Sequence, residues 1–513
     1  MMQKTIYILA FTAFFLGSCS DEFLNRVPES SVTSGNFYET EAQFDQALVG
    51  AYAAVRAAKG SIASWTMGEM RSDNTHLEFN NTNRGGQYIE REDADFFIDR
   101  SVSGLVADKY NSAYVGIARA NNILDYVVPA GLSQQAANRL TGQAKFLRAL
   151  FYFDLVRYFG GVPLYLKAVQ GSADAYVQRS SVDEVYKVIV DDLKDAISKL
   201  PAPTFPQTGR ATQGAARMLL ADVYLTQKNF AGAETELKSV LQMGYALLPD
   251  YASVFALGNK NSAESIFEIQ YQQGNQGQNS DFLYPFLPLS SDVKIITGIT
   301  SQNRQGGGWN TPTFEMIGTY EPGDKRLEAS IAVAEGTGVV GDMVIEVVKS
   351  PIGYKVPAGK RAYPFIKKYL HPHALEQNTD DNFPIYRYAD ALLAMAEALN
   401  EQNKSSEALP YLNQIRSRAG LPAATTSNQA SLRDIILHER RVELAFENKR
   451  WLDLVRTGKA IEVMTKNGEY IKSAHAGESY IPATSYVVSE QKLNFPIPNR
   501  EILIGNLQQN PGY

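Results

Sequence analysis

The sequence predicts a mainly α-helical protein in which tetratricopeptide-like helix pairs form a scaffold around a loop-rich, partly β inserted region. Two stretches carry this prediction. Residues 211–243 and 387–419 each place apolar residues at helical spacing on both sides of a polar break. Each stretch is about as long as one tetratricopeptide repeat. Between them, residues 245–386 contain strand-like alternation and segments rich in Gly, Gln and aromatic residues, which is typical of short strands and long loops.

The N-terminus is predicted to lie outside the folded body. In residues 1–18, Lys4 precedes an uncharged, mostly apolar run, as in a secretory signal peptide that is too short to span a bilayer. The run ends at Cys19, the single cysteine of the 513 residues, so stability must come from packing and not from an internal disulfide. Leu16-Gly17-Ser18-Cys19 resembles a bacterial lipobox, which predicts lipidation of Cys19. An ordinary signal peptide is the alternative. Residues 19–39 then read as a polar tether.

Residues 40–244 are predicted to form an N-terminal helical region. Thr40 with Gln43, and Ser181 with Glu184, make capping-box patterns, and Ser133 can cap a third helix. A further helix is predicted from near Val106 to Val128, before Pro129. One stretch in this region, residues 61–104, shows no sustained period and is rich in Asn, Asp, Arg and Gly. We expect it to be a long irregular surface segment, and such segments often carry function.

Residues 245–386 are predicted to be the loop-rich inserted subdomain, and residues 387–513 a C-terminal helical region with an extended tail. A helix after Ser431 is expected to continue to Phe446, and Trp451 is predicted to belong to the core. Short strands are predicted at residues 264–271, 343–348 and 365–369.

Composition and motifs exclude several classes of function. The net charge of −6 argues against nucleic-acid binding, and no later segment has 18 consecutive apolar residues. Gly336–Gly341 fits the dinucleotide fingerprint, but a strand follows it where a helix is needed, so a hairpin turn is predicted instead. The charged run Glu439–Arg456 is predicted to form structural ion pairs. With no nucleophile, metalloprotease or P-loop motif, the sequence predicts no enzyme and no cofactor.

Two segments contain possible metal ligands but lack the pattern of a metal site. His371-Pro372-His373 has no third histidine nearby and is predicted to be an exposed loop. Asn378–Asn382 offers oxygen ligands but lacks the spacing of a calcium loop, so a polar turn is predicted. The sequence therefore predicts no metal site.

The class of function that the sequence still favours is binding of a ligand at a surface. A glycan presents apolar C–H faces and many hydroxyls, which suit aromatic rings and Asp, Asn, Arg or Gln side chains respectively. Trp65 and Trp309 lie in irregular segments with such polar neighbours, although packing of the loops themselves is the alternative. The candidates from the residues alone are Trp65, Asn74, Arg84, Tyr284 and Trp309.

These features together resemble the SusD/RagB family of nutrient-uptake lipoproteins of Bacteroidetes, along nearly the whole chain after the signal. The acidic Ser20-Asp21-Glu22 after the cysteine resembles the surface-export signal of such lipoproteins. The motifs follow the family's order: Cys19–Leu24, Ala144–Ala149 through Gly160–Leu164, Ser181–Tyr186, Gly308–Thr313, Tyr320–Arg326, Arg387–Asp390, Glu439–Arg456, Phe495–Pro498 and Gln509–Tyr513.

The resemblance implies a lipoprotein held in the outer membrane by its N-terminal lipid, facing the cell exterior. It implies an oligosaccharide ligand and a SusC-like TonB-dependent transporter as partner, with this chain as a hinged lid. The family's ligand loops correspond to residues 61–104 and 272–312. Asp73 occupies the place where family members often carry an acidic ligand contact, and Trp309 lies in the matching Gly-Trp-Asn motif.

Three alternatives stay open at this point. Some members of the family take peptides, so a peptide-capturing lid is the first. A surface glycoside hydrolase is the second, and a tetratricopeptide scaffold without a small ligand is the third.

Overall fold

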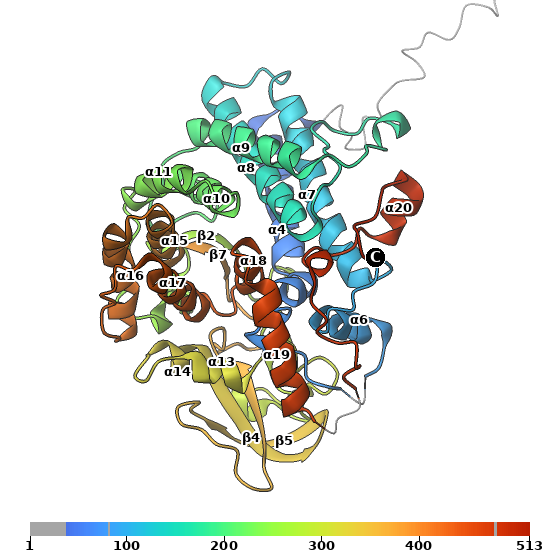
Figure 1. Ribbon diagram of the computed structural model, residues 1–513. Coiled ribbons are helices and arrows are strands. Elements are labelled where there is room, and N and C mark those ends of the chain that lie inside the picture. The colour runs from blue at the N-terminus through green and yellow to red at the C-terminus, as the bar shows by residue number, and fades with distance from the viewer. Residues whose placement is uncertain (1–36, 81–82, 477–479) are drawn as a thin grey trace, which may run out of the picture.

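The computed structural model is mainly α-helical, which confirms the predicted fold class (Figure 1). It describes residues 37–80, 83–476 and 480–513. The predicted signal peptide, the lipidation of Cys19 and nearly all of the tether lie outside the described residues. The boundaries proposed for the domains, at residues 244 and 386, stay a prediction.

Capping residues set where three long helices begin, as the sequence predicts. The Thr40 hydroxyl accepts from the backbone N–H of Gln43, whose side chain accepts from the Thr40 N–H in return, and α4 follows. The same reciprocal pair, Ser181 with Glu184, precedes α9. Ser133 caps α8 by accepting from the N–H of Ala136. The three helices are α4 (Glu41–Lys59), α8 (Gln134–Phe159) and α9 (Val182–Lys199).

The long helices pack in a row that runs through the molecule. Each helix of the row contacts the next, and both predicted helix pairs form, with breaks at the expected places. In Figure 1 the row runs from blue and cyan helices through green to brown ones. Its likeness to tetratricopeptide repeats stays a prediction. The further members are α7 (Gly104–Val127), α10 (Gln213–Thr226), α11 (Phe230–Leu241), α15 (Tyr388–Asn400) and α16 (Ser405–Ala419).

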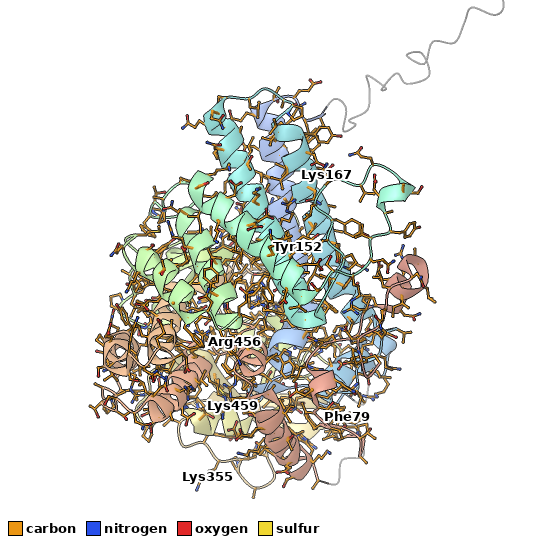
Figure 2. The ribbon with its side chains drawn as sticks, turned by 45° about the horizontal axis from the view of Figure 1, so that its top comes forward. Phe79, Tyr152, Lys167, Lys355, Arg456 and Lys459 are labelled. Atoms are coloured by element: carbon orange, nitrogen blue, oxygen red, sulfur yellow. The ribbon has the colours of Figure 1, made fainter. Side chains whose placement is uncertain are left out.

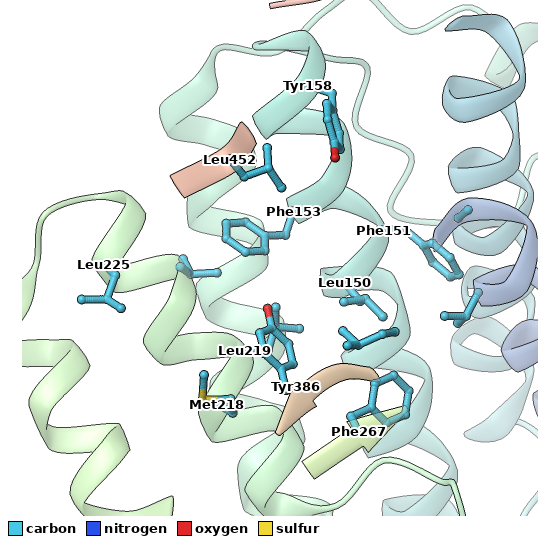
Figure 3. Packing of buried hydrophobic residues seen from close by; sticks show 14 of the residues in the cluster. Leu150, Phe151, Phe153, Tyr158, Met218, Leu219, Leu225, Phe267, Tyr386 and Leu452 are labelled. Atoms are coloured by element: carbon cyan, nitrogen blue, oxygen red, sulfur yellow. The ribbon is translucent and has the colours of Figure 1, made fainter. Parts of the chain in front are cut away.

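The apolar stripes of these helices meet in one large core. Figure 3 shows Leu150 and Phe153 of α8 beside Leu219 of α10, with Phe267 and Tyr386 nearby; all five side chains are buried. Burying a side chain of this size contributes about 1.5–3 kcal/mol each. The helical row is therefore held mainly by apolar packing.

The strands are short and form three small antiparallel sheets. The largest is the three-stranded sheet at the bottom of Figure 1, in the order β5-β4-β6. The other two are pairs, β2 with β7 and β1 with β3. The strands are β1 (Thr75–His76), β2 (Ser265–Ile269), β3 (Thr311–Pro312), β4 (Ile331–Val339), β5 (Asp342–Lys349), β6 (Arg361–Ile366) and β7 (Phe383–Arg387).

The glycine-rich fingerprint lies in the β4–β5 hairpin, so the hairpin prediction is confirmed. Most of its glycines are in strand β4 itself and not in the turn. A Cβ on Gly336 would lie 1.9 Å from the Val344 carbonyl oxygen of β5, so the close approach of the strand requires glycine there. The sequence missed β4 because its Gly-Thr-Gly run lacks strand propensity. It also placed β6 too late, at residues 365–369.

The prediction that residues 61–104 form an irregular surface segment is wrong. The segment contains two helices and a π-helical turn, Thr66–Met70, and the side chains from Ala63 to Leu77 are buried. They are covered because the segment packs against α18 and the chain around residues 441–450. The helices are α5 (Ile62–Trp65) and α6 (Gly86–Asp95).

The remaining helices are short or belong to the C-terminal region. The helix predicted to end at Phe446 ends at Glu443, and Phe446 has a left-handed backbone, with φ 67°. Trp451 is fully buried, as predicted. The helices are α12 (Lys294–Thr297), α13 (Phe314–Thr319), α14 (Arg326–Ser330), α17 (Gln429–Glu443), α18 (Arg450–Arg456), α19 (Ala460–Ala474) and α20 (Asn499–Gly505).

The predicted charged run does form structural ion pairs, mostly with distant elements. The fully buried carboxylate of Glu443 forms ion pairs with three arginines. The N···O distances are 2.5 Å to Arg387, 2.5 Å to Arg418 and 3.1 Å to Arg326. Burial alone would raise the pKa of Glu443, but these three guanidinium groups outweigh burial and hold its pKa far below its usual value. The run therefore ties α17 to β7, α14 and α16.

Candidate functional site

The two segments expected to hold ligand, residues 61–104 and 272–312, lie side by side. Strand β1 of the first pairs with β3, which lies at the end of the second. Beyond β1, the N–H of Glu78 donates to the Gly308 carbonyl at 2.9 Å, and Asn80 Nδ2 donates to the Arg304 carbonyl at 2.6 Å. We call the surface and interior formed by these two segments the loop face.

A buried asparagine and two glycines shape the second segment. Asn303 Nδ2 donates to the carbonyls of Tyr284, at 2.9 Å, and Pro288, at 3.1 Å. A Cβ on Gly307 would lie 2.3 Å from Asn303 Nδ2, and Gly308 has a left-handed φ of 76°. Only glycine fits both constraints without strain. This turn aims the next residue, Trp309, into the protein.

Both candidate tryptophans are enclosed by the chain. Trp309 is 8% exposed, and the Arg91 guanidinium carbon lies 3.9 Å from its ring centroid. Trp65 is 3% exposed and packs edge-on against Phe282 and Phe286, with ring centroids 5.7 and 5.2 Å away. In this conformation neither ring offers a face to a sugar, so both act here as packing residues.

Asp73 and Asn74 join the loop face to the C-terminal region. Arg450 donates to both carboxylate oxygens of Asp73, at 2.7 and 2.9 Å, and Arg441 Nε donates to Asn74 Oδ1 at 2.9 Å. Burial by itself would raise the pKa of Asp73, but the two arginines outweigh it and lower the pKa to about 2. Both side chains are therefore engaged within the chain.

Two further buried carboxyl groups complete this interior, and neither forms an ion pair with an arginine of the described ranges 37–80, 83–476 and 480–513. Glu69 accepts from Asn74 Nδ2 and from the backbone N–H groups of Phe446 and Asn448, and burial raises its pKa to about 7. Asp95 accepts from the N–H of Leu77, and burial raises its pKa to about 8.

Tyr284 is also an interior residue. It is buried in a small second core with strands of the three-stranded sheet, and its hydroxyl lies 3.0 Å from His373 Nε2. His371 of the same loop pairs with Asp381. No group of three or more His, Cys, Asp or Glu side chains that could hold a metal ion occurs in residues 37–80, 83–476 and 480–513.

Arg84 is the predicted site residue that reaches solvent. Its side chain is 40% exposed; it donates to both oxygens of Glu92 at 2.6 and 2.9 Å, and its guanidinium carbon lies 5.1 Å from the Phe79 ring centroid. The Phe79 ring stacks on Tyr480, with centroids 4.3 Å apart and planes 13° apart. The His475 ring packs against Tyr480 at 6.0 Å. We call Phe79, Arg84, His475 and Tyr480 the aromatic rim.

Sequence reasoning missed the aromatic part of this rim. Phe79 and Tyr480 are partly exposed, and Figure 2 places Phe79 at the periphery of the molecule. Two signals were available: Phe79 follows the alternating Thr75–His76–Leu77 segment, and Tyr480 stands alone in a stretch of small and polar residues. Their contact joins positions far apart in the chain, which no local pattern predicts.

Two family models match the chain. Residues 22–225 match the model described as starch-binding associating with outer membrane, and residues 263–513 match the model of the SusD family. Together they cover most of the sequence, including both segments of the loop face.

The chain belongs to the SusD family.

Individual relatives agree with this membership. The chain is 28% identical to the SusD-like protein P2 of Formosa agariphila, over 97% of each chain. It is 24% identical to the starch-binding protein SusD of Bacteroides thetaiotaomicron, over 77% of this chain and 76% of that protein. Among solved structures, a laminarin-binding SusD-like protein has a TM-score of 0.72 at 26% identity, over 93% of this chain and all of that one.

The family models also bear on location, since one of them is described as associating with the outer membrane. Within the described parts of this SusD-like chain, no helix combines the length and apolarity needed to cross a membrane.

Proposed function

We propose that this SusD-like protein is a non-catalytic, surface-exposed lipoprotein that captures oligosaccharides at the aromatic rim. This proposal rests on the partly exposed Phe79–Tyr480 stack beside Arg84 in a SusD-family fold. Relatives named for starch and laminarin binding support a glycan as the ligand class.

The rim offers both kinds of contact that a glycan needs. Partly exposed aromatic rings can receive the apolar C–H faces of sugar rings. The Arg84 guanidinium has N–H groups beyond the two that donate to Glu92, and these can donate to sugar hydroxyls. Because Glu92 fixes the guanidinium, Arg84 binds ligand from a preset position, which lowers the entropy cost of binding.

The test is a glycan array with purified protein. The wild type is expected to bind a defined set of oligosaccharides, and Phe79→Ala with Tyr480→Ala is expected to weaken that binding. Phe205→Ala is the matched control, because Phe205 is an exposed ring, 37% accessible, that packs against Tyr245 away from the loop face. Binding to peptides and to no glycan would replace this proposal with a peptide-capturing lid, and release of reducing sugar would establish a hydrolase.

We further propose that the protein delivers its ligand to a SusC-like TonB-dependent barrel as a hinged lid, with lipid at Cys19 as the anchor. The family membership supports this role. A lipidated cysteine carries more than one acyl chain, which suffices for stable attachment. Cys19→Ala is expected to leave folding and glycan binding intact while the protein leaves the membrane fraction. Retention in washed membranes of cells that lack the barrel would contradict the anchor.

A further inference from the structure

A second cavity lies between α7, the segment of residues 163–177 and α20. Its volume is about 410 Å³, within the range of sites that hold small ligands. It shares no residue with the loop face or the aromatic rim, and α20 lies at the edge of the molecule in Figure 1. The lining residues used below are Tyr110, Tyr114, Tyr165, Tyr176, Asn111 and Arg500.

Three of its tyrosines form a fixed aromatic wall. The rings of Tyr110 and Tyr114 lie 4.9 Å apart, and Tyr165 packs edge-on against Tyr114 at 5.7 Å. The Tyr114 hydroxyl donates to the Pro163 carbonyl and the Tyr165 hydroxyl to the Ala175 carbonyl, each at 2.8 Å. These hydrogen bonds hold the rings in place, so the wall is formed before any ligand arrives.

The buried hydroxyl of Tyr110, in this aromatic wall, lacks a clear hydrogen-bond partner. Tyr110 is 2% exposed, and no group in the part of the chain that the structure describes meets its hydroxyl with the distance and angle of a hydrogen bond. Burial raises the pKa of Tyr110, and the neighbouring Tyr114 hydroxyl offsets only part of that rise. Leaving a buried hydroxyl unpaired costs free energy. A ligand that carries its own hydroxyl groups can restore the missing bond, whereas an apolar ligand cannot.

The mouth of the cavity carries matching polar groups. The side chains of Asn111 and Arg500 make no hydrogen bond or ion pair within residues 37–80, 83–476 and 480–513, and Asn111 and Arg500 are exposed. Tyr176, 57% exposed, adds an open aromatic ring at the rim of the cavity. Ring faces combined with amide, guanidinium and hydroxyl groups fit a molecule with apolar C–H faces and many hydroxyls.

We propose that this tyrosine cavity is a second carbohydrate site, separate from the aromatic rim, which holds the end of an oligosaccharide. The ligand class rests on the proposed function, and the cavity adds a second place on the protein where that class binds. Two sites on one body strengthen the capture of a long glycan, because the second contact forms at a high effective concentration.

The experiment uses an array of plant, algal and host oligosaccharides, probed with the full-length protein and with variants. The Phe79→Ala, Tyr480→Ala double variant removes the rim. We expect it to keep weak binding to some glycans that the wild type binds. In that background, Ala118→Trp fills the mouth of the cavity from the exposed face of α7 and is expected to lower the residual binding about tenfold or more.

Two variants control for side effects. Val115→Trp adds the same ring at an exposed position of α7 that does not line the cavity, and it should leave the residual binding unchanged. Tyr110→Phe removes only the unpaired hydroxyl, so it should weaken binding without lowering the melting temperature. A destabilised Tyr110→Phe protein would assign the hydroxyl a structural role and overturn the proposal.

The outcomes separate this inference from the proposed function. If the wild type binds glycans and the double variant binds none, the cavity is not a carbohydrate site and the rim remains one. If the double variant keeps binding that Ala118→Trp does not reduce, the cavity is again excluded. If the wild type binds no glycan on the array, both proposals fall.

Discussion

Two sets of aromatic residues in and beside the loop face behave in opposite ways. Trp65 and Trp309 are enclosed by rings and by Arg91, whereas Phe79 and Tyr480 stack on each other at the surface. Trp65 and Phe79, one from each set, even lie in the same segment, residues 61–104. The difference is that elements distant in sequence cover the first set and leave the second open. Chemical type alone therefore does not mark a binding residue; what packs over the ring decides.

The largest effect on the free energy of unfolding is expected for the enclosed tryptophans, Trp65 and Trp309. Trp309→Ala removes a buried indole from a packed cluster and should lower the free energy of unfolding by about 3–5 kcal/mol. Denaturant unfolding measures this. If the variant loses less than about 1 kcal/mol of stability and also loses glycan binding, Trp309 is a binding residue like Phe79 and Tyr480. The distinction between the two sets would then be wrong.

Asp73 should show the next largest effect, with a definite pH dependence. Its pKa is about 2 in the fold against an ordinary 3.8, so its ionised form stabilises the fold above about pH 4. That stabilisation, about 2 kcal/mol at 1.36 kcal/mol per unit, is lost as the pH falls through 2. Asp73→Asn should therefore lower the free energy of unfolding by about 2 kcal/mol at pH 7. The variant should also lose less stability than the wild type as the pH falls from 4 to 2.

The control for Asp73 is Asp191→Asn, since Asp191 is an exposed residue of α9 that pairs with the likewise exposed Lys187 one turn earlier. It should change stability by less than about 0.5 kcal/mol. Equal acid limbs for wild type and Asp73→Asn would show that Arg450 and Arg441 do not hold the loop face.

The ionisation of Asp95 should change stability with pH in the direction opposite to that of Asp73. Its pKa is raised to about 8, so the fold binds a proton that the unfolded chain releases near pH 4, and stability falls as the pH rises between these values. Asp95→Asn cannot ionise and should gain at least about 1 kcal/mol over the wild type at pH 8. A variant that loses stability equally at pH 5 and pH 8 would contradict this role.

The smallest effect on stability is expected at the rim. Phe79→Ala removes a partly exposed ring and should cost less than about 1 kcal/mol of folding free energy. Its affinity for a bound glycan should fall about tenfold, which calorimetric titration measures. A large loss of stability with unchanged affinity would reverse the roles of the two aromatic sets.

Local patterns in the sequence predicted much of the helical body. Ser133, Ser181 and Thr40 mark helix starts because capping depends on residues three positions away. The membership in the SusD family followed from motifs spread along the chain. That resemblance also pointed to residues 61–104 and 272–312 as ligand loops, but it did not predict that the two segments pair with each other.

The interior of the loop face could not be predicted in the same way. Trp309 is buried because α6 supplies Arg91, and Asp73 is engaged because α18 supplies Arg450. Neither partner is visible from a local window of sequence. Likewise, the Phe79–Tyr480 stack joins two rings that lie in opposite halves of the sequence. Patterns with short periods report on helices and strands, and they carry no information on which distant segment covers a given side chain.

The bonds from the Glu69–Asn74 segment to residues 441–450 also constrain the order of folding. Glu69 and Phe446, like Asp73 and Arg450, are 377 residues apart in the chain. Contacts of such sequence separation form late, because the loop they close carries a large entropy cost. Helices α7, α8 and α9 have local partners and can assemble early. The loop face must wait for the C-terminal region, so a chain interrupted before α17 would retain helical structure and lack a finished loop face.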